Sequence, residues 1–174
     1  MSRLKIIAVV AFLVAVAGPL GASTLEAEVK AAYLLKLGSF VRWPAPPQAG
    51  PYFRICIVGR SDVAEALARL AHGQQVEGRA IAVTRMDLGQ VSNANGCQIL
   101  YLGKGAQSAQ AYLADTAGAP VLTVTDRHGG TRGGVIEFMQ RDGKVRFAID
   151  RGAAAARHME LNSKLLSAAA EVTP

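Results

Sequence analysis

The most polar loop of the sequence, from Thr125 to Gly134, carries residue types suited to acid–base chemistry. Asp126 and His128 lie two residues apart after an apolar run, at a position where α/β enzymes often place catalytic groups. A hydrolase triad also needs a nucleophile, and no serine stands in a nucleophile-elbow pattern. Four of the last six loop residues are glycine, which suits a backbone that adapts to a partner better than one that fixes catalytic groups. We therefore predict a non-enzyme, and take Arg127, His128 and Arg132 as candidate contacts of this loop with a partner or ligand.

Two other places could hold a cofactor or a metal. The turn from Gly59 to Asp62 follows an apolar run and opens a helical pattern, where backbone N–H groups can hold an anion. It contains one glycine and matches neither the dinucleotide-binding nor the P-loop pattern. His72 and His158 have no second imidazole or carboxylate at metal-ligand spacing. The sequence predicts no bound cofactor or metal.

The first 23 residues have the pattern of a bacterial secretory signal peptide. Arg3 and Lys5 precede an apolar stretch from Ile6 to Ala17, and helix breakers and small residues follow it. This stretch of about 12 residues is shorter than the roughly 20 that span a bilayer. We predict cleavage after Ser23, with cleavage after Ala17 as the alternative. The mature chain, residues 24–174, is then expected to be exported to an oxidising compartment.

Composition narrows the class of protein further. Loss of residues 1–23 removes two cations and no acids, so the formal charge falls from +6 to +4. The remaining cations are spread along the chain without a basic run, and few aromatic residues accompany them. This pattern argues against nucleic-acid binding. The length of the mature chain suits a single domain with one core.

From residue 52 onward, short apolar runs alternate with helical patterns. The expected strands are 52–58, 80–84, 97–102 and 120–124, and helices are expected from residue 62 to about 70 and from 107 to 114. Strands separated by helices of this length imply right-handed parallel crossovers. The fold class predicted is therefore α/β, a three-layer sandwich with a mainly parallel, Rossmann-like sheet.

The C-terminal part has a different pattern. Residues 135–139 and 144–149 alternate apolar and polar side chains on either side of Asp142-Gly143, which is a strong hairpin signal. We predict an antiparallel hairpin with one face exposed to solvent. The closing region, residues 152–170, is predicted to be helical and to pack back on the domain.

The segment KAAYLLKLGSFVRWP, residues 30–44, lies in a predicted helix spanning 24–41 whose apolar stripe is nearly a full turn wide. Its cations exclude a membrane span, because each costs a few kcal/mol near the bilayer centre. Two interpretations stay open. Either the helix is entirely core, or its surplus apolar side is a surface for a homodimer or a partner, formed by Tyr33, Leu37, Phe40 and Trp43.

Cys56 and Cys97 are the only cysteines. In an exported chain a disulfide is the default expectation for such a pair, and two buried free thiols are the alternative. If strand 52–58 is central, it lies beside strand 97–102. Both cysteines are expected toward the N-terminal part of their strands, and a spacing of about 4.8 Å between neighbouring strands allows the bond.

Seven segments in this order carry a resemblance to a known family. They are VKAAYLLKLGSFVRWP, FRICIVG, GCQILYLG, PVLTVTD, GGVIEF, VRFAID and LNSKLLSAA. Together they cover nearly all of the mature chain, and the chain resembles the YfiR family of exported proteins. Two departures are Asp150, where relatives usually have Asn, and a loop after Asp126 that lacks the phenylalanine common there. The second departure bears on partner or ligand contacts more than on the fold.

The resemblance implies a periplasmic regulator without catalytic activity. Such a protein binds the periplasmic sensor domain of an inner-membrane diguanylate cyclase and represses it, which lowers cyclic-di-GMP and biofilm formation. Release is linked to envelope stress, to redox damage of disulfides, and to an outer-membrane lipoprotein that sequesters the repressor. On this resemblance Cys56 and Cys97 match disulfide-bearing positions. The alternative is a periplasmic small-molecule sensor or an accessory protein of a signalling or transport system.

Overall fold

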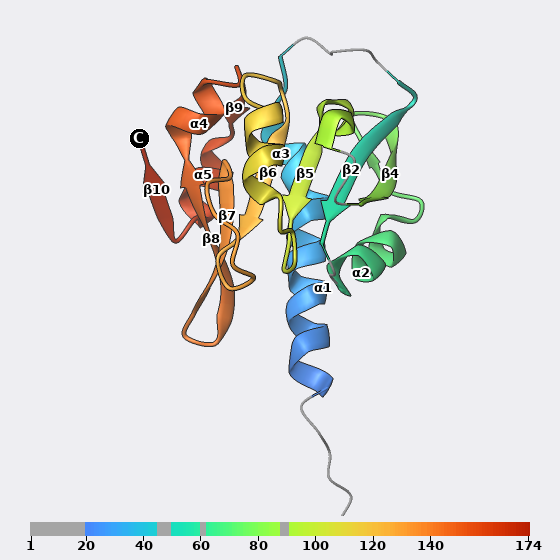
Figure 1. Cartoon of the computed structure of the whole chain (residues 1–174), viewed down its shortest axis with the longest axis vertical. Helices are drawn as coiled ribbons and strands as arrows, with labels where there is room; N and C mark the ends of the chain where they lie inside the picture. Colours follow the sequence, from blue (N-terminus) through green and yellow to red (C-terminus); the bar gives the residue numbers. More distant parts are fainter. Residues whose placement is uncertain (1–19, 45–49, 60–61, 88–90) are drawn as a thin grey trace, which may run out of the picture.

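The computed structural model describes residues 20–44, 50–59, 62–87 and 91–174. A mostly parallel sheet lies at the centre of the fold (Figure 1). Its strands are β2 (Tyr52–Val58), β3 (Gln75–Val76), β4 (Arg79–Met86), β5 (Ile99–Leu102), β6 (Leu122–Asp126), β7 (Ile136–Arg141), β8 (Lys144–Asp150) and β10 (Glu171–Thr173). The strand order is β10-β8-β7-β6-β5-β2-β4-β3. β2 is parallel to both of its neighbours, β4 and β5. β2 is therefore an interior strand, and β5 lies beside it, as expected if the first long strand is central.

Helices cover both faces of this sheet. They are α1 (Leu20–Leu37), α2 (Asp62–Ala71) and α3 (Ala109–Asp115). Ile55 and Ile57 of β2 pack in one apolar cluster with α1 and α2. Cys56 and Val58 point the other way and pack with α3, because successive side chains of a strand alternate between faces. The predicted three-layer α/β sandwich is confirmed.

The predicted hairpin forms from β7 and β8, which pair antiparallel. Asp142 and Gly143 have φ of 53° and 68°, the left-handed values that a two-residue hairpin turn requires. Phe138 and Phe147 are buried on one face, while Glu137 on the other is only partly buried. The hairpin therefore has one apolar face and one face open to solvent, as its alternating sequence predicts.

The first helix ends earlier than its sequence pattern predicts. α1 stops at Leu37, and a 3-10 turn, η1 (Gly38–Phe40), leads into β1 (Val41–Arg42). A Cβ at Gly38 would lie 2.9 Å from the Phe53 ring, so only glycine lets the chain pack this closely on β2. Val41, a β-branched residue, then pairs with Leu161 in a small antiparallel sheet.

The prediction of one closing helix over 152–170 is wrong. The region contains α4 (Arg151–Ala155), β9 (Glu160–Leu161), α5 (Ser163–Ala168) and then β10. His158 has a φ of 55°, which interrupts a right-handed helix. Asp150 and Asn162 accept hydrogen bonds from Ala153 N and Lys164 N at 2.7 and 2.8 Å, so each short helix has its own N-cap. β10 then extends the sheet parallel to β8.

Gly59 ends β2 with a φ of +100°, and a Cβ there would lie 2.6 Å from the Lys104 carbonyl oxygen. Gly59→Ala should therefore lower the free energy of unfolding by about 1–3 kcal/mol, from backbone strain and the steric overlap. Gly73→Ala is the control, because Gly73 also has a positive φ but open space around it. Urea denaturation of both variants measures the difference. Equal losses would show that the close approach to Lys104 contributes nothing.

Candidate functional site

The two cysteines form a disulfide, with Cα atoms 5.9 Å apart. The predicted strand 97–102 is shorter than expected, since β5 begins at Ile99. Cys97 instead follows the 3-10 helix η2 (Val91–Gly96), and its N–H bonds to the Ala94 carbonyl oxygen. Cys56 lies within β2, opposite Leu100. Both half-cystines are 3% exposed, so the bond fastens the segment before β5 to the middle of the sheet.

A buried ion pair ties α1 to the carboxyl end of β6. Lys30 Nζ lies 2.7 Å from Asp126 Oδ2 and also donates to Glu26 Oε1. Lys30 and Asp126 are 5% and 3% exposed. The Tyr101 hydroxyl, 3.0 Å away, donates to the same Oδ2, and Gly129 N–H donates to Oδ1 at 3.1 Å. Because both carboxylate oxygens already accept hydrogen bonds, Asp126 is better suited to hold the structure than to act as a general base.

A polar pocket of about 280 Å³ opens beside this pair. Its lining residues come from α1, α2, strands β5 and β6 and the loops after these strands: Glu26, Ala27, Lys30, Asp62, Val63, Tyr101, Lys104, Asp126, His128 and Gly129. It lies outside the carboxyl ends of parallel strands, where open α/β sheets place their ligands. Of the turn 59–62 considered for anion binding, residues 60 and 61 lie outside the described residues. The pocket combines cations and carboxylates, which suits binding of a polar molecule.

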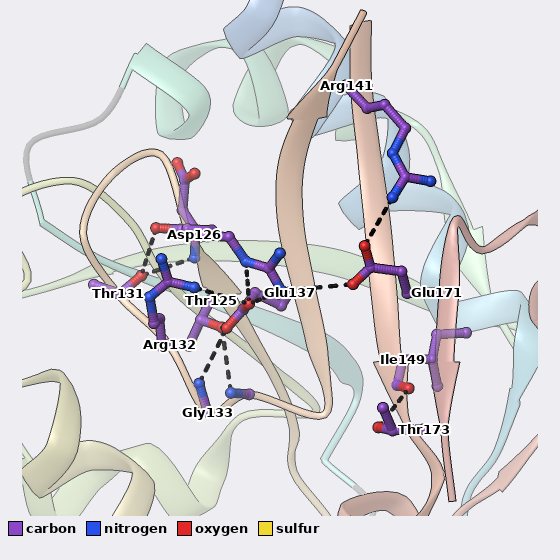
Figure 2. A network of polar contacts seen from close by, with 12 residues as sticks. Thr125, Asp126, Thr131, Arg132, Gly133, Glu137, Arg141, Ile149, Glu171 and Thr173 are labelled. Carbon is purple, nitrogen blue, oxygen red and sulfur yellow. Dashed lines mark hydrogen bonds and ion pairs between the residues drawn. The ribbon is translucent and has the colours of Figure 1, made fainter.

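Figure 2 shows Arg132 of the 125–134 loop beside Glu137 of β7. Arg127 and Arg132 lie 2.6 and 3.7 Å from Glu137 Oε1, on the solvent side of the hairpin. His128 lines the polar pocket instead, so the structure divides the three predicted loop contacts between two places. Thr131 Oγ1 donates to the Leu102 carbonyl oxygen at 2.6 Å. The loop is therefore anchored to β5 despite its glycines.

An apolar groove runs along the C-terminal half of α1. It has a volume of about 300 Å³, and its walls come from α1, η1, β8 and α5: Val29, Ala32, Tyr33, Lys36, Leu37, Phe40, Phe147, Lys164, Leu165 and Ala168. Tyr33 and Phe40 are partly exposed, whereas Leu37 is 2% exposed and forms part of the floor. Trp43 does not line this groove and packs edge-on against Phe53, with ring centroids 5.8 Å apart. Three of the four predicted surface residues therefore meet at one groove.

The family described as YfiR/HmsC-like matches residues 27–170, which include the disulfide, the polar pocket and the groove. The chain belongs to the YfiR/HmsC-like family. That family consists of periplasmic regulators and is not a known class of enzyme. The family match agrees with the resemblance carried by the sequence segments.

Comparison with solved structures supports the fold of this YfiR/HmsC-like chain. A conserved domain protein from Vibrio cholerae O1 biovar El Tor has a similar crystal structure, with a TM-score of 0.55 at 11% sequence identity. The similarity covers 84% of this chain and 60% of that one. At this identity the likeness concerns the fold alone. No curated protein matched the chain significantly.

Two features of the YfiR/HmsC-like domain were missed by sequence reasoning. The spacing of Glu26 and Lys30 predicts an i,i+4 ion pair, and the structure has it, but no sequence signal indicated Asp126 as the second partner of Lys30. The place of Lys164 in the groove could not be predicted, because the sequence pattern indicated one long helix over 152–170, whereas α5 is a separate short helix. The alternation of β8, which buries Phe147, was the available signal for the groove floor.

The ionisable groups of the described segments show no metal site: no group of three or more His, Cys, Asp and Glu side chains there could hold an ion. Arg157 is 9% exposed, and burial lowers the pKa of its guanidinium while nearby Asp150 opposes the shift. This arginine lines neither the polar pocket nor the groove. Its burial is a structural feature of the α4 region.

Proposed function

We propose that this YfiR/HmsC-like protein is a non-catalytic regulator that binds the periplasmic sensor domain of an inner-membrane diguanylate cyclase. Binding represses the cyclase and so lowers cyclic-di-GMP. The observation that carries the proposal is the family match over residues 27–170. An outer-membrane lipoprotein is the further partner that the family resemblance implies, and a homodimer is the alternative partner for the surplus apolar side of α1.

The proposal places the mature protein in the periplasm as a single domain, residues 24–174. The signal peptide lies mostly in residues 1–19, outside the described residues, and cleavage after Ser23 would fall in the first turn of α1. Within the part of the chain that the structure describes, no helix is long and apolar enough to cross a bilayer. Mass spectrometry of the protein purified from periplasm would locate the cleavage site.

The groove beside α1 is the contact surface that we propose for the partner. Tyr33 and Phe40 offer aromatic surface there, and aromatic residues are common energetic centres of interfaces. The purified sensor domain should bind the mature chain, and addition of the chain to membranes containing the cyclase should lower cyclic-di-GMP synthesis. Absence of both effects with every cyclase of the source organism that has a periplasmic domain would reject the proposed function.

Reductant should weaken partner binding before it unfolds the protein, because the Cys56–Cys97 bond fastens the segment before β5 to β2. The measurement is a pull-down of the sensor domain, with and without reductant, while tryptophan fluorescence reports folding. Cys56→Ser should mimic reduction, and its binding should no longer respond to reductant. Normal binding by this variant would contradict a redox-gated regulator.

A second candidate function is a periplasmic small-molecule sensor. The observation that favours it is the polar pocket, where His128 and Gly129 of the 125–134 loop meet Lys30 and Lys104. Saturable binding of a polar metabolite that is lost in His128→Ala, without loss of stability, would support this function. His128 is exposed, so its replacement tests the pocket without disturbing the core.

A further inference from the structure

The groove beside α1 has the features of a small-ligand site as well as those of a protein contact surface. Its floor is formed by Leu37, Phe147 and Leu165, which are 2%, 2% and 5% exposed. Tyr33 is held over this floor by edge-on packing against Phe147, with ring centroids 5.4 Å apart. The volume of about 300 Å³ lies at the lower end of the range, about 300–1,000 Å³, in which proteins bind small molecules.

Among the described residues, two lysines are the only charged ones that line this apolar space. Lys36 comes from α1 and Lys164 from α5, and both side chains are exposed. Among the residues that the structure describes, neither ammonium group has a carboxylate partner. Lys30, in contrast, is fully engaged by Glu26 and Asp126. The groove therefore joins an apolar interior to two cations that lack a counter-charge.

We infer that this groove binds a medium-chain carboxylate, with the hydrocarbon chain on the floor and the carboxylate between Lys36 and Lys164. Burial of the ligand's hydrocarbon chain supplies most of the binding free energy, because the hydrophobic contribution is proportional to the apolar area removed from water. The lysines supply charge-assisted hydrogen bonds to the head group. A helix, with a diameter of about 10 Å, is too wide to enter a hollow of this volume. One acyl chain fills it better.

The occupant would also compete with the partner, because Tyr33 and Phe40 belong to both surfaces. This consequence rests on the proposed function, in which the sensor domain docks at the groove. Binding of the carboxylate itself does not depend on the partner. The test below uses the purified mature chain alone, so that a failure of the ligand site and a failure of the proposed regulation are distinguishable.

The experiment is isothermal titration of the mature protein with octanoate and, as a neutral probe of the same chain length, with 1-octanol. Octanoate should bind saturably to one site and more tightly than octanol. Lys36→Ala/Lys164→Ala should weaken octanoate binding about tenfold and leave octanol binding unchanged. Ala168→Phe should abolish binding of both probes, because Ala168 is exposed and a phenyl ring there would occupy the groove.

Lys104→Ala is the matched control, since Lys104 is also exposed but lines the polar pocket. It should leave both affinities unchanged, and circular dichroism should show that every variant is folded. Undiminished octanoate binding by Ala168→Phe would place the site elsewhere and overturn the inference. Equal affinity for octanoate and octanol, or no effect of the double lysine variant, would also overturn it. Absence of octanoate binding to the unmodified protein would overturn the inference as well.

Discussion

Replacing Asp126 with alanine should lower the free energy of unfolding by about 3–5 kcal/mol, because removal of one partner leaves a buried charge uncompensated. Lys30 is 5% exposed and would keep only Glu26 as its carboxylate. The Tyr101 hydroxyl would also lose its acceptor Asp126 Oδ2, and the Gly129 N–H would lose Asp126 Oδ1. Urea denaturation followed by circular dichroism measures the loss.

Two further variants make this result specific. Glu160→Ala removes an ion pair with Arg42 whose side chains are 73% and 82% exposed, and it should cost less than about 1 kcal/mol. Lys30→Met/Asp126→Leu replaces the buried pair with apolar side chains, and it should recover part of the stability lost in Asp126→Ala. If Asp126→Ala lowers the free energy of unfolding as little as Glu160→Ala does, the Lys30–Asp126 pair contributes no more than an exposed ion pair, which contradicts the prediction.

Removal of the disulfide should have an effect of similar size. The half-cystines are 41 residues apart in the sequence, and in the chain-entropy model a loop of this length contributes about 4 kcal/mol. Cys56→Ser/Cys97→Ser should therefore lower the free energy of unfolding by about that amount. The midpoint of urea unfolding under oxidising conditions measures the change.

Reductant distinguishes loss of the bond from damage caused by the serine side chains. It should destabilise the unmodified protein by about 4 kcal/mol and leave the double variant unchanged. Both positions are 3% exposed, so Cys56→Ala/Cys97→Ala serves as a control without buried hydroxyl groups. Equal stability of the oxidised and reduced unmodified protein would contradict a stabilising role for the bond.

Much of the sheet could be predicted because its signals are local. The strand 52–58 agrees with β2 residue for residue, and the Asp142-Gly143 turn agrees with the β7–β8 hairpin. The closing region was predicted badly because its helix breakers are weak in sequence. His158 takes a positive φ there without being glycine, and β10 forms only because β8 offers an edge with which it can pair.

The candidate sites follow the same division. Helical spacing and apolar content placed Tyr33, Leu37 and Phe40 on one helix, and composition with the export signal predicted the disulfide. No local pattern could bring Lys30 to Asp126, which is 96 residues away, or Lys164 to the same groove as Lys36.

By itself the sequence determined the α/β class, the strand alternation, the hairpin and the family resemblance, since these depend on short-range periodicity and on segment order. Only the tertiary structure decided which charges are buried as pairs and which remain unpaired at the rim of an apolar groove. The physical reason is that burial and charge pairing depend on packing between α1, β6, β8 and α5, which are distant in the chain.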